Sequence, residues 1–217
     1  MEIKKTLLEK ISQAKKLIRE QADKYNGRYS IAFSGGKDST VLLNLCLQAG
    51  VDYRIDAVLS NYEFNETHRF MNEIENRYNV TINRHFYLDD PSKPEEAGRK
   101  NKVEKFKEVM ADVDCWFSGI RRDEGATRTD IKDVEELDGL VKVNPIADFC
   151  EIDIWRYLAI YRVPVNEAYK GGYRSLSCKL SSKPEESGDE SERDGRWKGV
   201  YGSCGGECGI HSQSLRK

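Results

Sequence analysis

The chain carries at residues 29–40 the stretch YSIAFSGGKDST, in which a short apolar run ends at a pair of glycines. Tyr29–Phe33 is apolar and β-prone, and Ser39–Leu47 resumes an apolar pattern at helical spacing. The two glycines interrupt the pattern, because glycine permits a sharp turn and a close approach of the backbone to a ligand. The stretch therefore predicts a strand, a glycine loop and a helix, in that order.

The glycine loop has the ingredients of a polyphosphate site. The amides at a helix N-terminus point at anions, Lys37 adds a cation, and three hydroxyl side chains add donors. The spacing differs from the Walker loop, in which four residues separate the first glycine from Gly-Lys. The predicted nucleotide-binding residues of this loop are Ser34, Gly35, Gly36, Lys37, Asp38, Ser39 and Thr40.

Outward from this stretch, short apolar runs alternate with segments of helical periodicity. Such alternation predicts an α/β fold with a doubly wound, mostly parallel, Rossmann-like sheet. The loops after Phe33, Leu59 and Phe117 should then lie on one rim, where ligands bind. Beyond the first unit, the expected elements are a helix over the first ~20 residues, strands at Ile55–Leu59, Val80–Phe86, Cys115–Ile120 and Val141–Ile146, and helices at Glu66–Tyr78 and Lys102–Met110.

The composition changes after about Lys179. We expect residues 1–178 to form the nucleotide-binding domain and residues 179–217 a mobile polar segment with a cysteine-bearing tail. Within it, Ser181–Arg196 has almost no apolar residue and predicts a solvated stretch. A plain linker and a lid that orders over substrate both fit this composition.

Composition and charge exclude several classes of protein. The net charge of −2 supplies no global positive field for nucleic acid. Residues 1–20 alternate apolar and charged side chains and lack the pattern of a secretory signal. We expect a cytoplasmic protein with no membrane and no nucleic-acid partner; a homodimer is compatible with the sequence.

Six cysteines are spaced too unevenly for a disulfide scaffold, so we expect reduced thiols. Cys46 and Cys115 lie in apolar runs and should be small buried hydrophobes. Cys178, Cys204 and Cys208 are the cysteines that invite chemistry.

The heptapeptide SGGKDST resembles the loop of the PP-loop ATP pyrophosphatase superfamily, whose fold is called adenine nucleotide alpha hydrolase-like. Other stretches resemble one branch of it, the phosphoadenylylsulfate (PAPS) and adenylylsulfate (APS) reductases. These stretches are YEFNET at 62–67, WFSGIRRDE at 116–124 with ATR at 126–128, NPIAD at 144–148 with EIDIW at 151–155, GYRSL at 172–176 and ECGIH at 207–211.

The resemblance implies a thiol-dependent reduction of PAPS or APS to sulfite. Cys208 as thiolate would attack the sulfur, leaving an S-sulfocysteine, and His211 would assist it or be a surface histidine. A second thiol would release sulfite, supplied by thioredoxin or glutaredoxin, or by Cys204. The further predicted nucleotide-binding residues are Arg121, Arg122 and Arg128, which would grip phosphate or sulfate or form surface ion pairs, and Tyr173 and Arg174.

Two departures from the family pattern keep alternatives open. No tandem cysteine pair exists, which disfavours an iron–sulfur cluster. Cys178, Cys204, Cys208 and His211 are nevertheless four potential ligands for such a cluster or for zinc. We therefore predict that the reductase needs no metal. The intact lysine loop instead fits an ATP-dependent adenylyltransferase or sulfur-transfer enzyme, which would cleave ATP between its α and β phosphates with Mg²⁺. A non-catalytic binding module is the third alternative.

Overall fold

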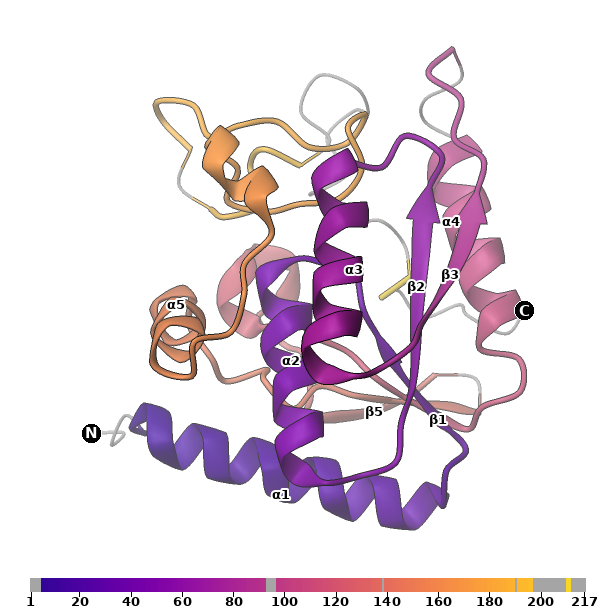
Figure 1. Cartoon of the computed structure of the whole chain (residues 1–217), viewed down its shortest axis with the longest axis vertical. Helices are drawn as coiled ribbons and strands as arrows, with labels where there is room; N and C mark the ends of the chain where they lie inside the picture. Colours follow the sequence, from indigo (N-terminus) through magenta and orange to yellow (C-terminus); the bar gives the residue numbers. More distant parts are fainter. Residues whose placement is uncertain (1–4, 93–96, 138, 190, 197–209, 212–217) are drawn as a thin grey trace.

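A six-stranded sheet forms the centre of the computed structural model, which describes residues 5–92, 97–137, 139–189, 191–196 and 210–211 (Figure 1). The strand order is β3-β2-β1-β4-β6-β5, and every neighbouring pair is parallel except β5 with β6. The predicted α/β class and mostly parallel sheet are thus confirmed. The strands are β1 Tyr29–Ala32, β2 Arg54–Ser60, β3 Ile82–Tyr87, β4 Cys115–Phe117, β5 Val134–Leu137 and β6 Leu140–Val143.

Helices cover both faces of the sheet. Strand alternation divides the core, because β4 turns Cys115 and Phe117 towards one face and Trp116 towards the other. α1, α2, α3 and α5 pack against the first face, and α4 packs against the second. The helices are α1 Leu7–Tyr25, α2 Lys37–Ala49, α3 Asn65–Tyr78, α4 Ala97–Val109 and α5 Glu151–Ile160, and short 3-10 turns span Arg122–Glu124, Ala126–Arg128 and Glu167–Gly171.

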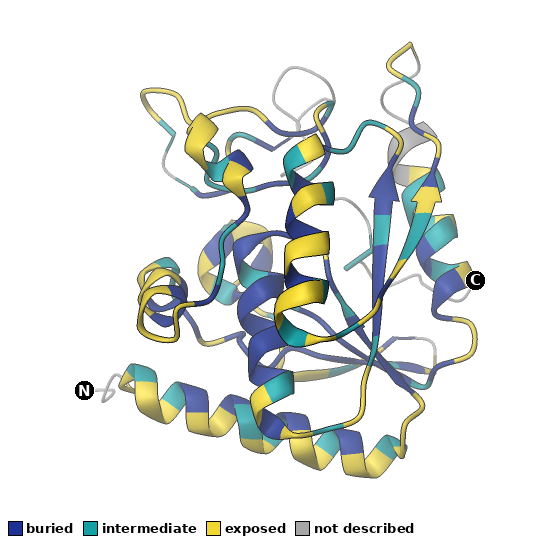
Figure 2. Cartoon of the chain, viewed as in Figure 1, coloured by how far each residue is buried: buried dark blue, intermediate teal, exposed yellow. Residues whose placement is uncertain are grey.

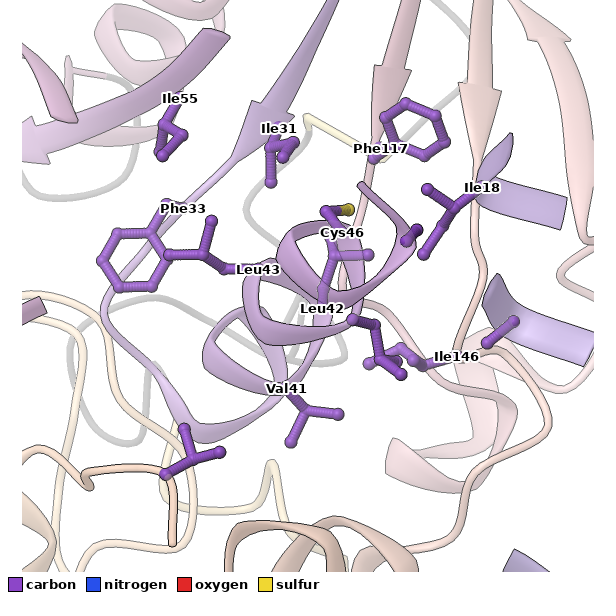
Figure 3. Close-up of a cluster of buried hydrophobic side chains, with 14 of the residues drawn as sticks. Ile18, Ile31, Phe33, Val41, Leu42, Leu43, Cys46, Ile55, Phe117 and Ile146 are labelled. Atoms are coloured by element: carbon purple, nitrogen blue, oxygen red, sulfur yellow. The ribbon is translucent and has the colours of Figure 1, made fainter. Parts of the chain in front are cut away.

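α2 lies at the heart of the larger core cluster. It is covered by the sheet, by α1 and by α5, so its sides are buried almost all round (Figure 2). Figure 3 shows Leu42, Leu43 and Cys46 of this helix among side chains from the strands and from α1. The glycine loop at the start of α2 is therefore fixed to a rigid support.

The expected elements are present, with ends that differ by a few residues. Cys46 and Cys115 are fully buried, as predicted. Burial raises the pKa of the Cys115 thiol to about 12, and it raises that of Cys46 as well. Neither thiol is suited to be a nucleophile at neutral pH.

The structure differs from the sequence-based expectation in the stretch 181–196, called here the polar segment. Five of its residues are buried instead of solvated: Ser181, Ser182, Glu192, Arg193 and Arg196. The reason is electrostatic, because charged side chains of the segment meet buried opposite charges on α2 and on the loop after β4. Within the described ranges, no helix combines the length and apolar character needed to cross a membrane.

Candidate active site

The loop between β1 and α2 turns sharply at Gly35, which has a φ of +74°. A Cβ at this position would also lie 3.0 Å from Thr67 Cγ2, so the turn requires glycine. Gly36 is the N-cap of α2, and its carbonyl accepts hydrogen bonds from the hydroxyls of Ser39 and Thr40, each at 2.9 Å. The predicted loop thus exists as a tight cradle at a helix N-terminus.

The loop after β4 presses directly on this cradle. A Cβ on Gly119 would lie 3.0 Å from the backbone nitrogen of Ser39, so only glycine lets the two loops approach so closely. The same loop then delivers Arg121, whose Nε donates to Asp38 at 2.7 Å. This contact brings together two of the residue groups predicted from the sequence.

Glu192 of the polar segment joins the two loops. Its carboxylate lies 2.6 Å from Lys37 Nζ and 2.6 Å from Nη2 of Arg121, and all three side chains are almost fully buried. Burial opposes the charge on Lys37, but Asp38, Tyr169 and Glu192 outweigh it and raise the pKa of the ammonium. Lys37 and Arg121 are therefore permanent cations neutralised from within the chain.

A pocket opens beside the cradle at the carboxyl ends of the strands. The loops after β1, β2 and β4 line it, as expected for a sheet of this topology, through Ser34, Glu63 and Ser118 among others. Ser39, Gly36 and Asp38 face it as well. The nucleotide-binding prediction for this loop is consistent with the pocket, and the rim prediction is confirmed.

Four cationic side chains from three parts of the chain line the pocket. α4 contributes Lys102, the turn after β4 contributes Arg128, and the polar segment contributes Arg193 and Arg196. Arg128 donates to Glu124, and Arg196 Nη1 donates to the carbonyl of Leu176 at 3.2 Å. This cationic wall can receive an anion with more than one negative charge.

Three residues of the cationic wall were not predicted from the sequence. Lys102 resembles any surface lysine of a charged helix, and nothing in its spacing marks it. Arg193 and Arg196 lie in the stretch whose composition predicts solvent exposure. The one available signal is that both arginines precede the ECGIH motif of the family resemblance in the chain.

His211 reaches the pocket from the far end of the chain. Its ring stacks on Trp116, with centroids 5.6 Å apart and planes inclined by 16°. Burial, with Arg128 and other cations nearby, lowers the pKa of the imidazole well below its ordinary value, so the ring is neutral. Its Nδ1 is buried and has no hydrogen-bond partner among the residues that the structure describes. A buried nitrogen of this kind is available for a hydrogen bond to a bound ligand or to a nucleophile.

The neighbouring pocket residue Glu63 was also missed. Burial raises the pKa of its carboxyl to about 7, although the Phe64 amide, Lys102 and Arg196 act in the opposite direction. Nothing in the sequence around Glu63, within the stretch 62–67, marks it as an acid–base group. The structure shows that a carboxyl able to exchange protons near neutral pH faces the pocket.

Seven predicted binding residues do not line the pocket: Gly35, Lys37, Thr40, Arg121, Arg122, Tyr173 and Arg174. Lys37 and Arg121 lie instead at Glu192, and the last three have partners elsewhere. Arg122 pairs with Asp133 at 2.7 Å and with Asp148, which is the ion-pair alternative for this arginine. Tyr173 packs edge-on against Phe64, with ring centroids 5.3 Å apart.

Arg174 points its guanidinium at Glu151 and Glu185, at 2.7 and 3.2 Å. Only its carbonyl meets the site, where it accepts from Lys37 Nζ at 2.7 Å. These side chains are turned away because carboxylates or aromatic partners outside the pocket hold them.

Of the cysteines that invite chemistry, Cys204 and Cys208 lie outside the described residues. Cys178 is buried, and its Sγ lies 3.2 Å from Ser181 Oγ and 3.7 Å from Asp89. The sequence predicts that these thiols and His211 bind no metal, and this stays a prediction.

Comparison of the fold with solved structures gives two informative matches. The FMN adenylyltransferase of Candida glabrata aligns with a TM-score of 0.65 and 23% identity, covering 84% of this chain and 67% of that one. The phosphoadenylyl-sulfate reductase of Candida auris, in a phosphate complex, aligns with a TM-score of 0.62 and 18% identity, covering 79% and 90%. Both likenesses establish the shared fold.

Sequence comparison identifies relatives named adenosine 5′-phosphosulfate reductase. That of Neisseria meningitidis is 34% identical over 146 residues, covering 66% of this chain and 58% of the relative. That of Halalkalibacterium halodurans is 26% identical over 203 residues, covering 86% of each. The chain thus spans little more than half the length of the first relative. Residues 28–184 match the phosphoadenosine phosphosulfate reductase domain, and the chain therefore belongs to that family.

Proposed function

We propose that the chain is a sulfonucleotide reductase, acting on adenosine 5′-phosphosulfate or its 3′-phosphorylated form. The observation that carries the proposal is the meeting of the cationic wall with His211 in one pocket at the strand ends. His211 is separated from Cys208 by two residues, Gly209 and Ile210. A thiol at that distance along the chain is within reach of an anion held by the wall.

The chemistry follows from the charges of the groups involved. The wall would hold the phosphosulfate and neutralise it, which lowers the barrier to attack by an anionic thiolate. Sulfur of Cys208 bonds to the sulfuryl sulfur, the sulfur–oxygen bond to the phosphate breaks, and the adenosine phosphate leaves. An S-sulfocysteine remains on the enzyme.

Release of sulfite needs two electrons from outside this residue. A thiol attacks Cys208 Sγ, expels sulfite and forms a disulfide, which a second thiol of the same reductant then reduces. We propose thioredoxin or glutaredoxin as the dithiol, with Cys204 as the internal alternative. The names of the relatives support this reaction over ATP cleavage.

The test is sulfite release from both nucleotides by the purified chain with thioredoxin and with dithiothreitol. Cys208→Ser should abolish release, because serine is a far weaker nucleophile at neutral pH. Cys150→Ser is the matched control, since Cys150 is the N-cap of α5 and does not line the pocket. This variant should release sulfite at the wild-type rate. Absence of sulfite from both substrates, or full activity of Cys208→Ser, would refute the proposal.

A further inference from the structure

The amides of the glycine loop are already occupied by oxygen atoms of the chain itself. Lys37 N donates to Tyr169 Oη at 2.9 Å. Gly36 N donates to Ser34 Oγ at 3.3 Å, and Ser34 N donates to Ser39 Oγ at 3.2 Å. Amides in this position point at an anion when such a loop holds one. Here, three of them have protein partners.

Glu192 supplies the negative charge that a bound anion would bring. Both of its carboxylate oxygens accept from Nη2 of Arg121, at 2.6 and 2.7 Å, and one of them accepts from Lys37 Nζ at 2.6 Å. A carboxylate held by a lysine and an arginine imitates two phosphate oxygens. Its side chain is only 4% exposed, so water does not screen the interaction.

We propose that Glu192 is a specificity-determining residue, which keeps nucleotides that carry a pyrophosphate, such as ATP, out of the glycine loop. A pyrophosphate would either share Lys37 and Arg121 with this carboxylate, where like charges repel, or displace it. Because of Glu192, the loop would keep its lysine and yet not bind ATP for cleavage between the α and β phosphates.

Displacement is opposed by the hydrogen bonds that hold Glu192 in place. The neighbouring Ser191 donates from its amide to Asp194 at 2.8 Å and from its hydroxyl to the carbonyl of Glu124 at 2.9 Å. The amide of Arg193 donates to the Ser191 hydroxyl at 3.2 Å. The turn that carries Glu192 is thus fastened on both sides, and an incoming anion would have to break these bonds.

Under the proposed function, a sulfonucleotide takes its countercharge from the cationic wall and does not need Lys37. This step rests on the proposed function. The exclusion of pyrophosphate depends only on the contacts among Glu192, Lys37 and Arg121.

The test is the binding of inorganic pyrophosphate and of ATP to the full chain by calorimetry. Glu192→Gln should bind pyrophosphate at least roughly tenfold more tightly than the wild type, because the repelling charge is gone and Lys37 is available. Glu185→Gln is the matched control, since it removes a carboxylate of the same segment that pairs with Arg174. It should bind as the wild type does.

The double variant Glu192→Gln with Lys37→Met should lose the gain. Because Glu192→Gln leaves two buried cations without their partner, it is also measured by thermal melting. Pyrophosphate should raise the melting temperature of Glu192→Gln more than that of the wild type, even if the variant starts lower.

Equal affinity and equal thermal shift of Glu192→Gln and wild type would overturn the inference, as would tight pyrophosphate binding by the wild type. Sulfite release is assayed on the same preparations. If the wild type releases no sulfite but Glu192→Gln binds pyrophosphate more tightly than the wild type, only the proposed function is refuted. If the wild type releases sulfite but the two proteins bind pyrophosphate equally, only the role of Glu192 is refuted.

Discussion

His211 stacks on Trp116 although 95 positions separate the two residues in the chain, with ring centroids 5.6 Å apart. Ile210 packs beside it against the cluster formed by α4 and Trp116. Ile210 and His211 are therefore anchored in the pocket by an aliphatic and an aromatic contact.

We expect His211→Phe to reduce sulfite release by about 100-fold or more, mainly through kcat. Phenylalanine keeps the stacking on Trp116 but lacks the ring nitrogens, of which Nδ1 is buried without a hydrogen-bond partner in the described part of the chain. His68→Phe is the matched control, because His68 lies on α3 and does not line the pocket. Steady-state kinetics with wild-type values for His211→Phe would exclude a role for its nitrogens.

The cationic wall makes a prediction about substrate affinity. Lys102→Met should raise KM about tenfold, because it removes one positive charge from the pocket in which the phosphosulfate would bind. Lys105→Met, one turn further along α4, removes a charge that pairs with Glu108 and should change KM less than about twofold. Equal effects of the two variants, measured under the same salt, would show that only the overall charge matters.

Glu63 makes the free energy of unfolding depend on pH. Its pKa is about 7 in the folded chain against 4.5 when unperturbed, so the folded state binds more protons than the unfolded state between these values. Stability contributed by the protonated carboxyl is therefore complete below pH 4.5 and is lost as the pH rises through 7. Lys102 and Arg196 oppose this loss, because their positive charges favour the ionised carboxylate.

We expect Glu63→Gln to be more stable than the wild type above this pH window by roughly 1–3 kcal/mol, and equal to it at acidic pH. Urea unfolding at the two ends of the window measures the difference. A constant difference between variant and wild type at both pH values would contradict the raised pKa.

Gly119→Ala should lower the free energy of unfolding by about 1–3 kcal/mol, because the new Cβ would lie 3.0 Å from the backbone of Ser39. The loop that carries Arg121 would be pushed away from the glycine loop. Chemical denaturation with an unchanged midpoint would mean that the two loops are not in close contact in solution.

Local patterns predicted the elements well because each pattern is repeated over many residues. α1 and α3 have apolar spacing that only a helix brings to one face. β5 was not predicted, since its sequence Val134-Glu135-Glu136-Leu137 has two charged residues and it pairs only at the antiparallel edge of the sheet. Its formation depends on β6 as a partner and not on its own hydrophobicity.

The predicted site residues also divide into those fixed by the local sequence and those fixed by neighbours in space. Those of the glycine loop are fixed by local geometry, and the structure finds them together. The family resemblance predicts nucleotide binding by Arg122, Tyr173 and Arg174. The direction of each of these side chains depends on the carboxylate or ring that lies beside it. A motif specifies residue types in order, whereas neighbours in space decide where each side chain points.

By itself, the sequence determined the strand, the glycine loop and the helix that follows, because the turn at Gly35 and the apolar repeat of α2 are local properties. It also determined the family, through motifs of fixed spacing. Only the tertiary structure decided that Glu192 lies at Lys37, 155 residues away, and that the polar segment supplies two arginines to the pocket. The physical reason is that a buried charge must be neutralised, and the partner that does so is chosen by folding and not by position in the chain.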